Sequence, residues 1–154
     1  MSVAVAYKIT GHGWAGCTID IDGQRICLEA SFLSDSLDDL LRATRVAVEA
    51  RMESTAIFTD EPGESRLKLI PSGDRLLVRA LRFRDEFSKA SDDEGELVAE
   101  AECRLRTFAG AVLAACQEVY REVGVEAYQA SMRHTFPIEQ MDALRAALQT
   151  KHSN

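Results

Sequence analysis

The sequence predicts an α+β fold in which a largely antiparallel sheet of about six to seven strands has helices packed on one face. Its 154 residues, of which 46% are hydrophobic and 28% charged, are typical of one folded domain. Segments that alternate apolar and polar residues are joined by short turns, which favours antiparallel pairing. Helical spacing occurs once mid-chain and again at the C-terminal end. The expected order is therefore βββαββββααα over residues 1–150, with 151–154 as a frayed tail.

The first three predicted strands cover residues 3–10, 14–22 and 24–32. Asp22-Gly23 is typical of a two-residue hairpin turn, and a turn there would pair Cys17 with Leu28. Cys27 would then point to the opposite face of the sheet, which excludes a disulfide between these two cysteines. No cysteine has zinc-ligand spacing, so we expect no metal site. The cysteines are expected to be buried, reduced thiols.

The next stretch, SDSLDDLLRATRVAVEARM, switches to helical spacing. Leu37, Leu40, Leu41 and Val48 fall on one side, which predicts an amphipathic helix of about 15 residues. Ser36 and Asp39 have the spacing of a capping box at its start.

The sequence TDEPGESRLKL, residues 59–69, begins within a strand predicted over residues 54–61. It is either an acidic catalytic cluster or the bend of a hairpin. Asp60, Glu61 and Glu64 would suit acid–base catalysis if burial separated their pKa values. However, Pro62 and Gly63 fit the two central positions of a type II turn, and a hairpin tip is well solvated. We therefore predict a hairpin, with Arg66 pairing to one of the three acids.

A second predicted hairpin turns at Gly73-Asp74 and pairs Leu69 with Val78 and Leu67 with Ala80 on a core face. The opposite face mixes charged and apolar side chains: Arg66, Lys68, Ile70, Leu77, Arg79, Leu81 and Phe83. This face is too apolar for a fully solvated sheet surface, so we expect either a helix or another subunit to cover it. Its apolar residues are the interface candidates: Ile70, Leu77, Leu81 and Phe83.

The net charge of −7 is concentrated in residues 85–102, where eight acidic residues accompany Lys89. Residues 66–84 just upstream are basic, with six Lys or Arg residues against Asp74. We expect cross-strand pairing between them, with residues 97–103 as the strand that completes the sheet. This compensation argues against nucleic-acid binding, which requires an uncompensated basic face.

Three helices are predicted near the C-terminus, in RLRTFAGAVLAACQEVYREVG, VEAYQASMRH and IEQMDALRAALQTKH. Pro137 lies near the start of the last one. His134 ends the middle helix, where a structural role for a cation near the helix dipole is expected.

His12 lies between two glycines in GHGW, near Trp14. An alternative hypothesis is a small-ligand-binding protein or enzyme that uses His12 and Trp14 with Asp60 or Glu61, and with Arg66. Glycines 11, 13 and 16 match a dinucleotide spacing, but they lie between two predicted strands instead of opening a helix. No nucleophile elbow, signal peptide or membrane segment is recognisable. We therefore expect a cytoplasmic protein with no cofactor and no membrane contact.

The segments GWAGCTIDIDG, FLSDSLDDLL, DEPGESRLKL and FPIEQMDALRAAL together resemble an uncharacterised family of small bacterial α+β proteins with an E-P-G-E turn motif. The resemblance covers nearly the full chain and departs from the family pattern at Phe58 and Ser65. It implies a bacterial origin, and no activity or catalytic residue comes with it.

These observations favour a non-enzymatic protein-interaction protein whose partner is another protein or a second copy in a homodimer. An immunity-like role is one version of this hypothesis. Small size and a concentrated acidic segment that would meet a basic partner point to it.

Overall fold

The structure is a computed structural model that describes residues 2–85, 87 and 89–150. The predicted frayed tail, 151–154, lies outside the described residues. The predicted order βββαββββααα is confirmed. The elements are β1 (Val3–Gly11), β2 (Trp14–Ile21), β3 (Gln24–Ser31), α1 (Ser36–Ala50), β4 (Ser54–Thr59), β5 (Glu64–Ser72), β6 (Arg75–Phe83), β7 (Glu96–Arg104), α2 (Leu105–Glu122), α3 (Val125–Met132) and α4 (Ile138–Gln149), with a short 3-10 helix at Asp92–Glu94.

The strands form two antiparallel sheets, one of three strands in the order β1-β2-β3 and one of four in the order β4-β5-β6-β7. Both predicted hairpin registers are confirmed. Cys17 pairs with Leu28 in the first sheet, and Leu69 pairs with Val78 in the second. The helix α1 joins β3 to β4, and these two strands contact each other without joining the sheets.

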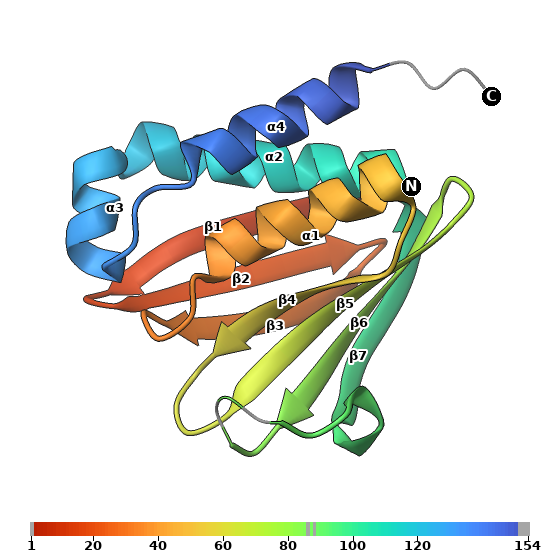
Figure 1. Ribbon diagram of the computed structural model, residues 1–154, viewed down its shortest axis with the longest axis horizontal. Helices are drawn as coiled ribbons and strands as arrows, with labels where there is room; N and C mark the ends of the chain where they lie inside the picture. The colour runs from red at the N-terminus through yellow and green to blue at the C-terminus, as the bar shows by residue number, and fades with distance from the viewer. Residues whose placement is uncertain (1, 86, 88, 151–154) are drawn as a thin grey trace.

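The helices α1, α2 and α4 pack together on one side of the strands, as Figure 1 shows. The helix α2 packs on β1 and α1 packs on β4, so one hydrophobic core lies between the helices and both sheets. We call the core-facing side of the four-stranded sheet its inner face and the other side its outer face. None of the described helices is long and apolar enough to cross a membrane.

The predicted capping box of α1 is wrong. Asp35 is the N-cap residue, and Ser36 lies in the first turn. The hydroxyl group of Ser36 is buried and shares a 2.7 Å hydrogen bond with Tyr7. The Asp39 carboxylate accepts a 3.2 Å hydrogen bond from the Ile57 amide of β4. Both side chains thus fix α1 to the strands, and neither caps its first turn.

The predicted hairpin at residues 59–64 is confirmed, because Thr59 pairs with Glu64 across β4 and β5. The turn is not of type II. The Glu61–Pro62 peptide bond is cis, and the positive φ belongs to Glu61, at 35°, and not to Gly63. Gly63 is required for another reason. A Cβ there would lie 2.6 Å from the Phe83 carbonyl oxygen, so only glycine lets the turn approach β6 this closely.

The cysteines are free, as expected, and those at 17 and 27 lie on opposite faces of their sheet. Burial raises the pKa of the Cys17 thiol to about 12. The expectation that all four are buried is wrong for Cys27, which is exposed.

Candidate functional site

The outer face of the four-stranded sheet contains buried charged residues. Glu64 is 2% exposed, and Arg66 and Lys68 are each 9% exposed. All three lie on β5, at alternate positions that share this face. Charged side chains are almost never buried to this extent unless they are paired. The partners of these residues therefore decide whether the face is stable.

Asp92, in the 3-10 helix between β6 and β7, supplies the central partner. Its carboxylate accepts a 2.9 Å hydrogen bond from Arg66 Nη1 and lies 2.8 Å from Lys68 Nζ. Arg66 Nε also donates to Glu64 over 3.0 Å. We call Glu64, Arg66, Lys68 and Asp92 the charge cluster.

The charge cluster shifts the pKa values of two members. The hydrogen bond from Lys68, with further help from Arg66, lowers the pKa of Asp92 below its usual range, although burial acts in the opposite direction. Burial works against the charged form of Arg66, but the hydrogen bonds to Asp92 and Glu64 outweigh it and raise the pKa of this side chain. The segment that carries Asp92 is therefore held to the sheet by charges that persist at neutral pH.

The same segment covers part of the apolar outer face. The Arg66 guanidinium lies 3.9 Å from the centre of the Phe83 ring. A Cβ at Gly95 would lie 2.6 Å from that ring, so the 91–95 backbone passes directly over Phe83. Of the interface candidates, Phe83 and Leu81 are thus buried, at 5% and 7% exposure. Ile70 and Leu77 are half-buried. A helix or another subunit was expected to cover this face. Part of the cover is instead the short acidic segment 91–95.

Beside this segment the outer face has a groove of about 330 Å³, which we call the outer groove. Its apolar lining residues are Ile70, Leu81 and Leu97. Its charged lining residues are Glu53, Lys68, Arg79, Asp92 and Asp93. The groove therefore offers an apolar surface surrounded by charges of both signs.

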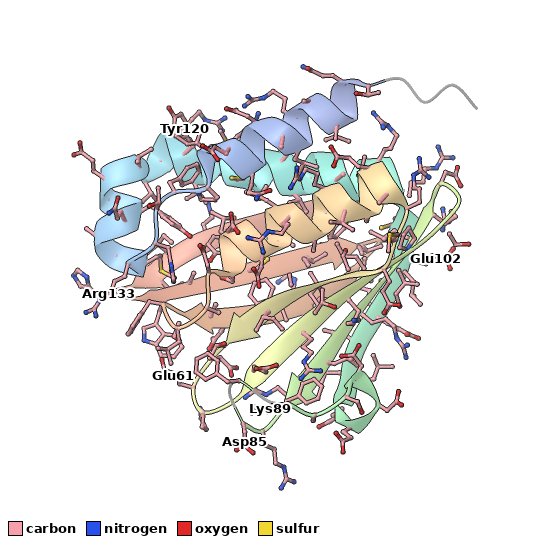
Figure 2. All side chains as sticks on the ribbon, in the orientation of Figure 1. Glu61, Asp85, Lys89, Glu102, Tyr120 and Arg133 are labelled. Atoms are coloured by element: carbon pink, nitrogen blue, oxygen red, sulfur yellow. The ribbon has the colours of Figure 1, made fainter. Side chains whose placement is uncertain are left out.

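The predicted cross-strand charge pairing between β6 and β7 is confirmed. Arg79 lies 3.0 Å from Glu100, and Arg75 lies 3.0 Å from Glu102. These pairs are partly exposed, with Glu102 near one end of β7 in Figure 2. Much of the negative charge of residues 96–102 is thus balanced within the sheet.

The ligand-binding candidates from the sequence lie in different places. His12 and Trp14 are exposed at the β1–β2 hairpin. Asp60 pairs with Arg82 over 2.5 Å, and Glu61 is exposed in the β4–β5 turn (Figure 2). Arg66 pairs with Glu64, as one of the predicted choices had it, and belongs to the charge cluster. None of the hydrogen bonds and ion pairs of the described residues joins His12 to Asp60 or Glu61.

A larger cavity, of about 770 Å³, lies between the start of α1 and the link from α3 to α4. His134 Nε2 lies 2.7 Å from the Phe32 carbonyl oxygen, and its Nδ1 lies 3.8 Å from the Asp35 carboxylate. Burial raises the pKa of Asp35, although the charge of His134 opposes the shift. Sequence reasoning missed Asp35, because SDSLDD signals only a helix start. Both His134 nitrogens face acceptors, which fits the structural role expected for this residue.

Comparisons with known proteins give a fold relationship. No family model matches the chain, and no curated protein matches it. A chain of the CdiA-CT/CdiI toxin and immunity complex from Enterobacter cloacae has a similar fold, with a TM-score of 0.51 and 11% sequence identity. The match covers 75% of this chain and 99% of that chain. At this identity the likeness shows the fold alone.

Proposed function

We propose that this protein is a non-enzymatic binding protein that recognises another protein through the outer face of its four-stranded sheet, and that its role is immunity-like. The observation that carries the proposal is the charge cluster, in which Glu64, Arg66 and Lys68 are buried and Asp92 is partly exposed. Replacing a buried ion pair by well-packed apolar residues is often neutral or stabilising, so such charges are poor devices for stability. The inner face of the same sheet is apolar and completely buried, at 0% exposure for Leu67 and Leu69. A charged outer face is therefore better explained by recognition.

The chemistry of the outer face favours a basic partner. Arg79 and Arg75 are balanced by acids of β7. Among the described residues, Asp93 and Glu96 are exposed acids without an ion pair. Opposite charge on a partner would steer association and exclude acidic competitors. The fold likeness to a chain of a toxin and immunity complex supports the immunity-like version.

Co-expression with the product of the adjacent gene tests the proposal. The chain and that product would be produced together in a bacterial host, with growth and co-purification as readouts and calorimetry on the purified pair. We expect growth protection and a stoichiometric complex, both weakened by the double charge reversal Asp93→Lys with Glu96→Lys. The matched control is Glu126→Lys, an exposed acid of α3. A toxic neighbour that kills equally with and without this chain, and does not bind it, would overturn the proposal.

Self-association is the other form of the interaction hypothesis. Ile70 and Leu77 are the half-buried candidates for a homodimer interface. Light scattering after size exclusion would show a dimer that Leu77→Lys converts to a monomer. If the wild type is a monomer at about 100 μM, a homodimer of ordinary affinity is excluded, and the partner must be a different protein.

The cavity beside His134 favours a second candidate function, small-ligand binding. Its volume of about 770 Å³ lies in the range of ligand sites, and its lining combines Phe136 and Ile138 with Asp35 and Gln140. The lining has three carboxylates, Asp35, Asp38 and Glu139, against the guanidinium of Arg133, so an amine is the expected ligand class. Thermal unfolding with a panel of free amino acids and polyamines would test this. A rise in Tm that Asp35→Asn abolishes supports it, and an unchanged Tm across the panel argues against it.

A further inference from the structure

We propose that the outer groove receives a lysine or arginine side chain of the partner protein. This inference rests on the proposed function, because it names the chemistry by which the same face would recognise a protein. Three properties of the groove favour such a side chain: its size, its apolar lining and the sign of its unmatched charge.

The size of the outer groove fits a side chain better than a free metabolite. Its volume of about 330 Å³ lies at the lower limit for small-molecule sites. The groove lies on the outer face of the sheet, beside the 91–95 segment that Asp92 holds in place. A protruding loop of a partner can therefore insert one long side chain without opening the core.

The apolar lining fits the stem of a basic side chain. Leu81 and Leu97 are paired neighbours on β6 and β7, and Ile70 lies on β5. Leu97 is 43% exposed, which leaves apolar surface for a ligand to cover. Lysine and arginine bury aliphatic stems along such surfaces while their charged ends stay at a polar rim.

The charges of the groove favour a cation over an anion. Lys68 already has three acceptors, at 2.5 Å from Thr55 Oγ1, 2.8 Å from Asp92 and 3.4 Å from Glu53. Arg79 Nε lies 3.0 Å from Glu100, which is an ion-pair distance, although this buried Nε makes no hydrogen bond. By contrast, Asp93 has no ion pair among the described residues. Glu53 lies 3.4 Å from Lys68, which is already bound to Asp92, and 54% of the Glu53 side chain is exposed. The charges left without a close counter-charge are therefore acidic, and a carboxylate of a partner would face them unfavourably.

Two short peptides test the inference without a known partner. N-acetyl-Gly-Arg-Gly-amide and its Glu counterpart would be titrated into ¹⁵N-labelled full-length protein and followed by NMR. We expect the Arg peptide to shift the amide signals of Leu81, Gly95 and Leu97 with millimolar affinity, and the Glu peptide to leave them unchanged. The double variant Glu53→Gln with Asp93→Asn should bind the Arg peptide about tenfold more weakly, since each rim charge contributes up to about 1 kcal/mol. Glu126→Gln should bind it like the wild type.

Circular dichroism would first show that each variant is folded, and Glu53 and Asp93 are exposed enough for this to be expected. Equal shifts from both peptides, no shift in the groove up to about 20 mM ligand, or wild-type affinity in the double variant would each overturn the inference.

The outcomes separate this inference from the proposed function. If the neighbouring gene product binds the wild type and the double variant equally well, the groove assignment fails and the protein-binding function stands. If the Arg peptide binds the groove but the neighbouring gene product forms no complex and gives no protection, the groove stands and the immunity-like function fails.

Discussion

Both faces of the four-stranded sheet contain buried residues, but these residues are buried by different means. On the inner face, Phe58, Leu67 and Val78 are 0% exposed and belong to the hydrophobic core. On the outer face, Glu64, Arg66 and Lys68 are nearly as buried, and a short acidic segment supplies the counter-charge. Apolar burial is non-directional and depends little on pH, whereas buried charges are stable only with correctly placed partners. The inner face therefore stabilises the fold through the core, whereas the buried charges of the outer face depend on the segment that carries Asp92.

The largest expected effect comes from the inner face. Phe58→Ala should lower the free energy of unfolding by about 4 kcal/mol, because it leaves a cavity in the core. Urea denaturation would measure it, and the loss should be the same between pH 5 and pH 8. Phe87→Ala is the matched control: Phe87 is 62% exposed, so its loss should stay within about 0.5 kcal/mol. Similar losses for the two variants would contradict the assignment of Phe58 to the core.

On the outer face, Asp92→Asn should lower the free energy of unfolding by about 1.5 kcal/mol at pH 7, because it weakens the hydrogen bonds to two buried cations. The loss is limited because Asp92 itself is partly exposed. The folded-state pKa of Asp92 is lowered, so the carboxylate stabilises the protein above its unfolded pKa of 3.8. This contribution disappears as the pH falls through the folded-state pKa. The difference between wild type and variant should therefore be complete at pH 7 and shrink below pH 3.8.

The control for this variant is Asp93→Asn, one residue further along the same segment. Asp93 is exposed and has no ion pair among the described residues. Its replacement should therefore change the free energy of unfolding by no more than about 0.5 kcal/mol at any pH. A pH-independent loss for Asp92→Asn would show that packing, and not charge, holds the segment.

The half-buried carboxylate of Asp35 has no such cluster, and its removal should change stability in the opposite direction. Burial raises the pKa of Asp35, so its charged form costs stability as the pH rises above the unfolded value of 3.8. Asp35→Asn should raise the Tm at pH 7, by less than Asp92→Asn lowers it, and the gain should vanish near pH 3. Asparagine is as good an N-cap residue as aspartate, so the helix start is preserved. A lower Tm at pH 7 would mean that the pair with His134 outweighs the burial of Asp35.

The sequence predicted the inner face well and the outer face only in part. Alternation and the Asp22-Gly23 and Gly73-Asp74 turns are local signals, and they were sufficient for both hairpin registers. The division into two sheets depends on how α1 packs between β3 and β4, which no local pattern records. The cover of the outer face was missed for a similar reason, because SDDEG has the composition of a solvated loop.

The candidate site shows the same limit. The mixed outer face containing Ile70, Leu77, Leu81 and Phe83 was recognisable from strand periodicity, as was its need for a cover. The partner of Arg66 and Lys68 was not, because Asp92 is 26 residues from Arg66 in the chain and meets it only after β6 turns back. The same holds for Asp35 and His134, which lie just before α1 and just after α3.

The smallest effect is expected for the exposed Arg75–Glu102 pair. It tests whether the charge cluster stabilises the protein because its cations are buried, and not simply because its charges are paired. Glu102 lies 3.0 Å from Arg75, a distance similar to those within the cluster, but the two side chains are 58% and 40% exposed. Water and salt screen such a pair, so Glu102→Gln should change the free energy of unfolding by no more than about 0.5 kcal/mol. Added salt at 0.5 M should leave that small difference near zero. Most of the Asp92→Asn difference should persist, because the side chains of the partners Arg66 and Lys68 are only 10% and 11% exposed and screening acts mainly on exposed charges. A loss for Glu102→Gln as large as that for Asp92→Asn would mean that the outer face is held by cross-strand pairs in general, and the special position of the 91–95 segment would be lost.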